Sequence, residues 1–353
     1  MKRSTKIILG ILIPIATGAL LAGLAFVYVV YYPFAPASDA DEVDILVRWG
    51  ASFGSVADTL HDKGVVRSVD QLKFTAELFD KTQSLRVGKF TLKQGMSNDA
   101  ALKALIEGPQ TYIKVTLPEG YDSRRYASIV ESKLDIDSSR FVALVHDSSF
   151  IRELNVSAPS LEGYLYPETY QFTYGLQARQ VIQTFVNYFF NMMSDSLIQE
   201  ANQKGMTLNE VLTLASIIEG EAMVDDEMPI ISSVYHNRLE IGMRLQADPT
   251  IQYIVPDGPR RLLRSDLKID SPYNTYMHAG LPPGPINNPA IRAIRAAIRP
   301  ADSDYLYFVA TGDGTHSFSR TYDQHLNAKR RFDEIRRQVA QEQRQKASHA
   351  ETP

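Results

Sequence analysis

The hydrophobic pattern of the chain is most pronounced at the N-terminus, where an uncharged run extends from Ile7 to Tyr32. A run of this length is sufficient to cross the hydrocarbon core of a bilayer as a helix. Lys2, Arg3 and Lys6 precede it, so the excess of cations predicts that the N-terminus lies in the cytoplasm. A signal peptide cleaved near Ala35-Pro36-Ala37 is the alternative, but the apolar run is longer than such peptides carry. We therefore expect a retained single-pass anchor.

Beyond the anchor, alternating segments and amphipathic stretches predict a strand–helix–helix–strand unit. Alternate apolar residues from Ile45 to Trp49 have the period of two typical of a half-buried strand, and residues 87–92 form a second such segment. Between them, Ser55 and Ser68 are expected to cap two helices. A further helix is predicted to start after Gly95-Met96-Ser97.

The pattern changes near residue 111 to a longer mixed region. Residues 112–117 predict a strand, and residues 123–134 predict a helix. The tyrosine-rich segment 161–170 suits either a sugar cleft or a core loop. We expect an α+β protein with four parts: anchor and linker at 1–38, a small βααβ module at 39–110, a larger mixed α+β domain at 111–340, and a polar tail at 341–353.

Composition narrows the function classes. The chain is 44% hydrophobic and 22% charged, as expected for a globular protein. A net charge of −4 makes nucleic acid an improbable partner. The absence of cysteine excludes disulfides, a thiol nucleophile, thiolate metal sites and a lipidated cysteine, so the helix itself must be the anchor.

The helix predicted at 207–224 contains the best candidate for acid–base chemistry. Projected at the helical period, Glu219 falls within the apolar stripe, whereas Glu221 projects to the other side. A desolvated carboxylic acid has a raised pKa and can act as a general acid at a glycosidic oxygen. The alternative is a glutamate that merely ends the helix. Glycoside hydrolysis also needs a second carboxylate, for which Glu162, Glu221 and Asp248 are candidates.

Several motifs, in order along the chain, resemble those of the YceG-like endolytic murein transglycosylases, and the resemblance covers nearly the whole length. Residues 43–108 are also similar to the LysM-like module of that family. The motifs are LEGYLYPETY at 161–170, LASIIEGE at 214–221, NRL at 237–239, MRLQADPT at 243–250, SPYNTY at 271–276, GLPPGPI at 280–286 and His316-Ser317-Phe318 with Thr321 and His325.

The resemblance implies an anchored enzyme of the cell inner membrane, with its N-terminus cytoplasmic and its catalytic domain periplasmic. It implies cleavage of the β-1,4 bond between N-acetylmuramic acid and N-acetylglucosamine in nascent peptidoglycan strands, which terminates strand elongation. Glu219 would protonate the leaving oxygen, and the C6 hydroxyl of the muramic acid would then close a 1,6-anhydro ring. The substrate thus supplies the nucleophile. Peptidoglycan synthases are the implied protein partners.

Four motif residues, Gln246, Asp248, Asn274 and Tyr276, have groups that can hold sugar hydroxyls and N-acetyl amides, although the same residues also suit turns. Glu162 is expected either to line the cleft as a second acid or to cap its loop. The spacing of His236, His316 and His325 fits no zinc motif, so we expect no metal and no cofactor.

Two other functions stay open at this point. A muramidase would use water and a second carboxylate, and would leave reducing muramic acid ends. A noncatalytic peptidoglycan-binding scaffold would depend on the LysM-like module alone. A metal-dependent amidase is a more distant alternative.

Overall fold

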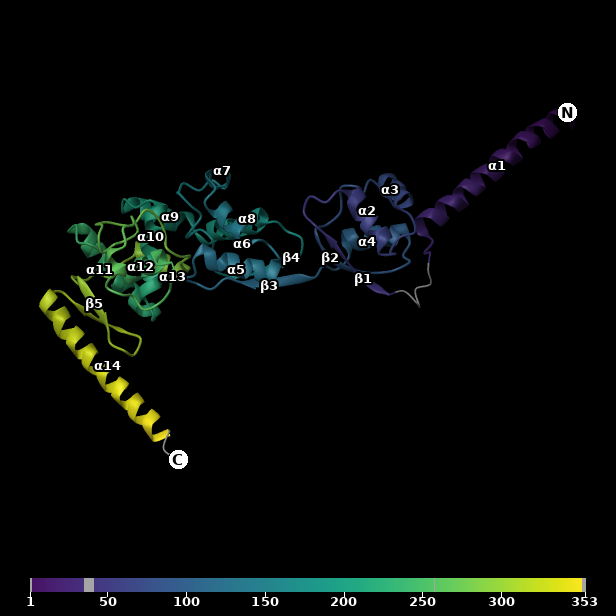
Figure 1. The fold of residues 1–353 in the computed structure, drawn as a ribbon. Helices are drawn as coiled ribbons and strands as arrows, with labels where there is room; N and C mark the ends of the chain where they lie inside the picture. Colours follow the sequence, from purple (N-terminus) through teal and green to yellow (C-terminus); the bar gives the residue numbers. More distant parts are fainter. Residues whose placement is uncertain (1, 35–40, 257, 351–353) are drawn as a thin grey trace. The chain divides into compact units, whose positions relative to one another are not determined.

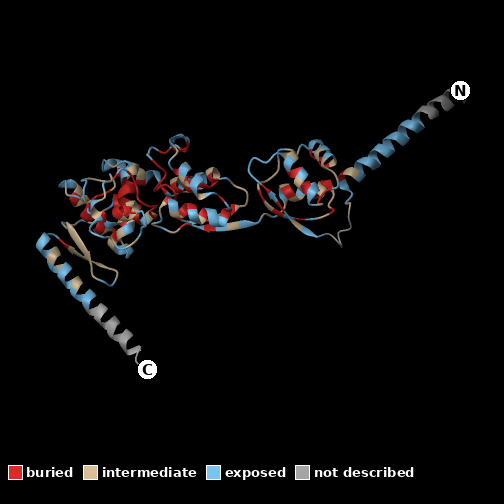
Figure 2. Ribbon diagram, in the orientation of Figure 1, coloured by how far each residue is buried: buried red, intermediate tan, exposed pale blue. Residues whose placement is uncertain are grey.

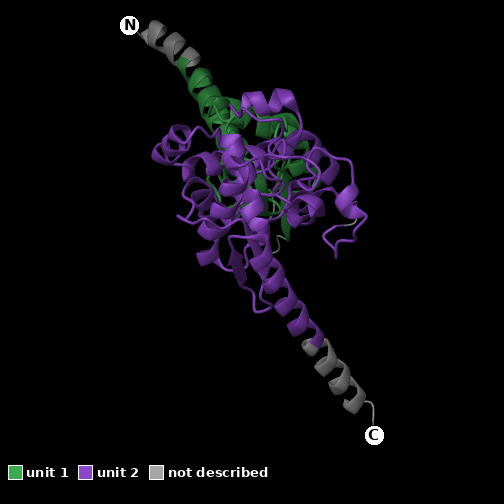
Figure 3. Ribbon diagram, turned by 90° about the vertical axis from the view of Figure 1, so that its left-hand side faces the viewer, with its two compact units in different colours: residues 1–115, 170–177 green, residues 116–169, 178–353 purple. Residues whose placement is uncertain are grey.

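The computed structural model describes residues 2–34, 41–256 and 258–350, with the backbone alone at 2–11 and 338–350 (Figure 1). The alternative cleavage site at 35–37 and the last three residues of the predicted tail lie outside this description. The chain forms two compact units, coloured separately in Figure 3, which are described in turn. The first comprises residues 1–115 and 170–177, and the second comprises 116–169 and 178–353.

The first unit begins with helix α1 (Lys2–Tyr31), in the region where the uncharged run predicts the anchor. Its segment Leu12–Tyr31 is long and apolar enough to cross a membrane, and almost all of it is exposed. The last turn is different because it packs against the following module. Val30 is fully buried, and the side-chain amide of Asn98 donates to the carbonyl of Val29 at 2.8 Å.

The module after α1 has the predicted strand–helix–helix–strand order. Strands β1 (Glu42–Val47) and β2 (Gly88–Lys93) pair antiparallel, with Ile45 opposite Phe90. Between them lie α2 (Phe53–Asp62) and α3 (Val69–Leu78), and α4 (Asn98–Glu107) follows β2. Alternate β1 residues and one face of each helix enclose a single apolar core.

The helix caps show how local chemistry starts these elements. Ser68 accepts from the backbone N–H of Gln71, as predicted, and Ser97 caps α4 in the same way. The predicted cap at Ser55 is wrong, since α2 starts at Phe53 and Ser52 accepts from the N–H of Ser55. Such one-turn differences are expected when two serines precede one amphipathic run.

The segment 170–177 is remote in sequence from the rest of the first unit. It joins that unit because the N–H of Trp49 donates to the carbonyl of Gly175 at 2.8 Å. Strand β4 (Thr169–Thr173), which pairs with β3 (Tyr112–Thr116), leads into this segment.

The second unit is mainly helical. In the view of Figure 2 its buried residues concentrate around α10. Its elements are α5 (Ser123–Leu134), α6 (Ser138–Val145), α7 (Ser148–Glu153), α8 (Ala178–Met192), α9 (Asp195–Gln203), α10 (Leu208–Glu221), η1 (Asp225–Glu227), α11 (Met228–Glu240), α12 (Asp248–Ile254), η2 (Asp266–Lys268), α13 (Ile291–Ile298), the antiparallel hairpin β5 (Tyr307–Ala310) and β6 (His316–Ser319), and α14 (Tyr322–Ala350).

Helix α10 is the central element of this unit. A capping box formed by Thr207 and Glu210 starts it, as predicted for Thr207, and every residue from Val211 to Ile218 is buried. The helix ends at Glu221, earlier than the predicted Val224, because Ala222 adopts an extended backbone conformation. The two glutamates of the motif therefore occupy the last turn of a buried helix.

Candidate active site

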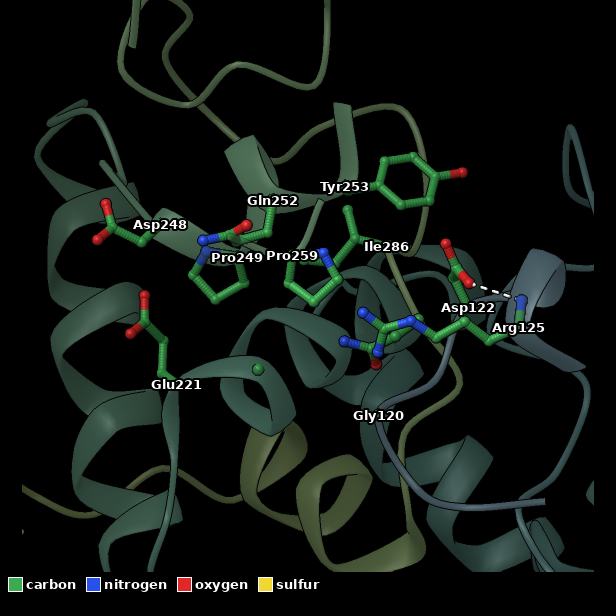
Figure 4. A pocket seen from close by; sticks show the side chains of 12 residues that line it. Gly120, Asp122, Arg125, Glu221, Asp248, Pro249, Gln252, Tyr253, Pro259 and Ile286 are labelled. Carbon is green, nitrogen blue, oxygen red and sulfur yellow. Dashed lines mark hydrogen bonds between the residues drawn. The ribbon is translucent and has the colours of Figure 1, made fainter. Parts of the chain in front are cut away.

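A cavity of about 300 Å³ lies at the C-terminal end of α10 (Figure 4). Gly220 and Glu221 of α10 and Asp248 and Pro249 of α12 line one part of it. Asp122, the N-cap of α5, lines another part. The cavity is therefore built from segments that are far apart in the sequence, and its carboxylates belong to different helices.

Glu221 has the chemistry of a general acid. Its side chain is partly buried and accepts a hydrogen bond from the Tyr235 hydroxyl at 3.1 Å. Burial, first of all, and the negative charge of Asp248 raise the pKa of Glu221 to about 7, although the Tyr235 hydrogen bond and the charge of Arg238 lower it. A carboxyl group of this kind is substantially protonated near neutral pH and can both donate and accept a proton.

Asp248 is the second carboxylate of this cavity. Figure 4 shows it beside Glu221, on the first turn of α12. Its Oδ1 accepts a hydrogen bond from the Tyr276 hydroxyl at 2.5 Å. Asp248 is exposed, and this hydrogen bond holds its side chain at the cavity wall.

Gly220 allows α12 to approach α10. A Cβ atom built on Gly220 would lie 2.7 Å from the Cβ and 2.9 Å from the Cγ of Pro249, closer than side chains pack. The lower helix propensity of glycine is thus offset by a close contact that brings the start of α12 to the end of α10.

A second cavity, of about 450 Å³, meets the first at the same two acids. Glu221 and Asp248 line both cavities, and Gln246 and Tyr276 line only the second. The structure therefore brings together three of the predicted substrate-contact residues, Gln246, Asp248 and Tyr276, with Glu221 between the two cavities.

Glu219, the acid predicted from the helical projection, lies next to Gly120 of the first cavity, where a Cβ atom built on Gly120 would be 3.5 Å from the Cγ of Glu219. It is partly buried, lines neither cavity, and accepts from the backbone N–H of Ala290, the N-cap of α13, at 3.1 Å. Burial raises its pKa, whereas the Ala290 hydrogen bond and Arg292 lower it. The Glu219 carboxylate is desolvated, as its place in the apolar stripe predicts. Its neighbours are the N-terminus of α13 and the charged side chain of Arg292.

Glu162 takes the loop-capping alternative rather than the cleft-lining one. It is 1% exposed and accepts from the backbone N–H and hydroxyl of Ser123 and from the side-chain amide of Asn288. Asn288 also accepts from the backbone N–H groups of Gly163 and Leu165. Residues 161–167 are all buried, so this segment is a core loop and the sugar-cleft interpretation is corrected.

Asn274 also differs from the expected position. It is fully buried, and its amide donates to the carbonyls of Leu267 and Ile269 while its oxygen accepts from the N–H of Tyr276. Asn274 therefore shapes the loop that presents Tyr276. Tyr235 and Asn288 were missed at the sequence level, because no local pattern distinguishes a tyrosine or asparagine that meets its partner through the fold.

Two of the three histidines considered as metal ligands have separate hydrogen-bond partners. His236 contacts the carbonyl of Ala297, and His316 pairs with Glu227 through Nδ1 at 2.7 Å. Among the residues that the structure describes, no three histidine, aspartate or glutamate side chains converge to hold a metal ion.

A glutamic acid with a pKa near 7, at a cavity that a second carboxylate and an amide also line, has the chemistry that general acid–base catalysis requires. The YceG-like family model matches residues 45–331, which is most of the chain. The protein belongs to the YceG-like family.

Named relatives agree with this assignment. An endolytic murein transglycosylase of Bacillus subtilis (strain 168) is 31% identical over 306 residues, covering 82% of this chain and 84% of the relative. One from Streptococcus pneumoniae (strain D39) is 29% identical, covering 81% of this chain and 59% of the relative. The crystal structure of a YceG-like protein from Listeria monocytogenes superimposes with a TM-score of 0.56 at 32% identity, covering 82% of this chain and 99% of that protein.

Proposed function

We propose that this protein is an endolytic peptidoglycan lytic transglycosylase that cleaves the β-1,4 bond between N-acetylmuramic acid and N-acetylglucosamine. The main observation is that Glu221, whose pKa burial raises to about 7, stands where two cavities meet. The family and the names of the relatives supply the substrate class.

In the proposed mechanism, protonated Glu221 donates its proton to the glycosidic oxygen as the bond to C1 of the muramic acid breaks. The resulting carboxylate then accepts the proton of the C6 hydroxyl, which attacks C1 and closes the 1,6-anhydro ring. The same carboxyl group is regenerated, so one residue serves as acid and base. The Tyr235 hydrogen bond orients this carboxyl group throughout.

Asp248 supports a second candidate function. Because it lines both cavities with Glu221, it has the position from which a carboxylate could activate water, as in a hydrolytic muramidase. In the transglycosylase mechanism, Asp248 instead stabilises positive charge that develops at C1. The two functions give different ends on the released strand.

The test is digestion of uncrosslinked peptidoglycan strands, with product ends measured by mass spectrometry. Wild-type protein should release strands with 1,6-anhydromuramic acid ends. Glu221→Gln should reduce cleavage at least about 100-fold, the usual effect of removing a general acid. Glu219→Gln is the matched variant, two residues away, and should retain most activity.

Each other outcome has a clear meaning. Reducing muramic acid ends would replace the transglycosylase by the muramidase. Loss of activity in Glu219→Gln with retention in Glu221→Gln would return the catalytic role to Glu219. If the wild-type protein binds strands and never cleaves them, the protein is a noncatalytic peptidoglycan-binding scaffold.

We further propose that α1 anchors the protein in the inner membrane, with residues 1–6 cytoplasmic and both units periplasmic. The apolar helix and the cations before it support this orientation. We also propose that the βααβ unit serves as a LysM-like module and that the catalytic domain spans residues 111–340. Cleavage of nascent strands by this domain would end their elongation. Peptidoglycan synthases are the proposed protein partners.

A further inference from the structure

The second cavity has a wall that the proposed chemistry leaves unexplained. The hairpin β5–β6 and the first turns of α14 form this wall. On α14, Tyr322, His325 and Lys329 follow one another at spacings of three and four residues, so they share one face of the helix. All three line the cavity.

Aromatic rings form the surface of this wall. The rings of Tyr307 and His325 stack with centroids 5.4 Å apart and planes 27° apart, and the ring of Tyr322 lies 6.2 Å from His325. The guanidinium of Arg238 covers Tyr307 at 5.6 Å. Tyr322, by contrast, is 58% exposed although it lines the cavity. A ring exposed in this way is available for the apolar face of a sugar.

Polar groups accompany the rings. Nδ1 of His325 is buried and has no hydrogen-bond partner among the described residues. Gln246 supplies an exposed amide, and Lys329 supplies an exposed cation. An amide and an imidazole suit an N-acetyl group and ring hydroxyls, while the lysine suits a carboxylate.

The position of the wall relative to the acids determines which part of a polymer it meets. Glu221 and Asp248 line both cavities, so a strand cleaved at Glu221 has sugars on each side of that residue. An enzyme that cuts within a strand must hold sugars on both sides of the bond, because binding to the flanking sugars positions the reacting one.

We propose that the second cavity binds an N-acetylmuramyl residue on one side of the cleaved bond, with its ring on Tyr322 and its anionic peptide substituent on Lys329. This inference rests on the proposed function, since it assumes that the polymer in the cleft is a glycan strand. The wall formed by β5–β6 and α14 would therefore select strands that carry stem peptides.

The experiment measures equilibrium binding to the full chain, in detergent, with Glu219→Gln and Glu221→Gln combined to prevent cleavage. One probe is an uncrosslinked peptidoglycan strand with stem peptides, and the other is a chitooligosaccharide, which has no anionic substituent. Tyr322→Ala should weaken binding of both probes by about tenfold. Lys329→Met should weaken binding of the peptidoglycan strand alone by about fivefold.

Matched variants control for folding. Arg330→Met removes the neighbouring cation, which does not line the cavity, and should bind both probes like the parent protein. Tyr322→Phe keeps the ring and should also bind like the parent. Tyr112→Ala removes an exposed tyrosine of the first unit and should have no effect.

Unchanged binding in both Tyr322→Ala and Lys329→Met would overturn the inference, and so would failure of the parent to bind either probe. Equal weakening of both probes by Lys329→Met would exclude recognition of the anionic substituent. Cleavage by the wild-type protein is measured separately. If binding depends on Tyr322 but the wild-type protein does not cleave the strand, the proposed function is rejected and the proposed binding site is supported.

Discussion

At the residue scale, the properties of Glu221 come from burial and from neighbours with opposing effects. Burial and the charge of Asp248 favour the protonated form, and the Tyr235 hydroxyl favours the carboxylate. Glu219 is only two residues away, yet its main contact is a backbone N–H at the start of α13. Small differences in position at the end of one helix thus separate a carboxyl group in a cleft from one at a helix start.

The pKa of Glu221 predicts the pH profile of cleavage. A general acid must be protonated, so activity should fall as the pH rises through about 7. Asp248→Asn removes a charge that raises this pKa and should shift the alkaline limb to lower pH. Tyr235→Phe removes a hydrogen bond that lowers this pKa and should shift the limb to higher pH.

The measurement is the rate of strand cleavage against pH for the three proteins. The position of the limb is compared rather than the maximal rate, because either substitution could reduce the rate for other reasons. Shifts in the same direction for both variants, or a limb that stays in place, would exclude Glu221 as the titrating group.

At the element scale, the buried loop 161–167 depends on close packing. Gly163 has φ of +86°, which favours glycine, and a Cβ atom there would lie 2.6 Å from Cγ of Pro285. Asn288 also holds the loop, because its side-chain oxygen accepts from the backbone N–H groups of Gly163 and Leu165. The proline-rich segment is therefore part of the packing that supports the core loop.

Gly163→Ala should destabilise the protein by about 2–5 kcal/mol, the sum of a left-handed alanine and an overpacked contact. Gly242→Ala is the matched control, because Gly242 also has positive φ, +68°, but a Cβ atom there meets nothing within 4 Å. It should cost only about 1–2 kcal/mol. Thermal and urea unfolding of both variants give the comparison, and equal losses would show that the Pro285 contact has no energetic role.

At the scale of the whole molecule, the end of helix α1 packs on the βααβ module within the first unit. The end of α1 is buried against α3 and α4 through Val30 and through the hydrogen bond from Asn98. Arg67 adds a contact with the Tyr28 ring at 5.3 Å. The module is therefore held at the end of the apolar helix by packing as well as by the chain.

The absence of cysteine makes the membrane orientation directly testable. A single cysteine at Asp58, an exposed position of α2, should react with a membrane-impermeant maleimide from the periplasmic side of intact spheroplasts. A single cysteine at Ser4 should react only after the membrane is permeabilised. Labelling of both positions in intact spheroplasts, or of Ser4 alone, would contradict the proposed orientation.

The sequence by itself determined the features that depend on local order. These are the apolar helix, the strand–helix–helix–strand order of the first unit, the Thr207 cap of α10 and the family motifs, each of which is visible in a short window. Helical periodicity also indicated that a carboxylate in the last turn of α10 would be desolvated.

Only the tertiary structure decided which carboxylates face the cleft. Glu219, Glu221 and Glu162 differ in the groups that surround them, and those groups come from distant segments: Ala290, the pair Tyr235 and Asp248, and Asn288. A carboxyl group acquires its pKa from neighbours in space, and a periodic pattern contains no information about which neighbours the fold will supply.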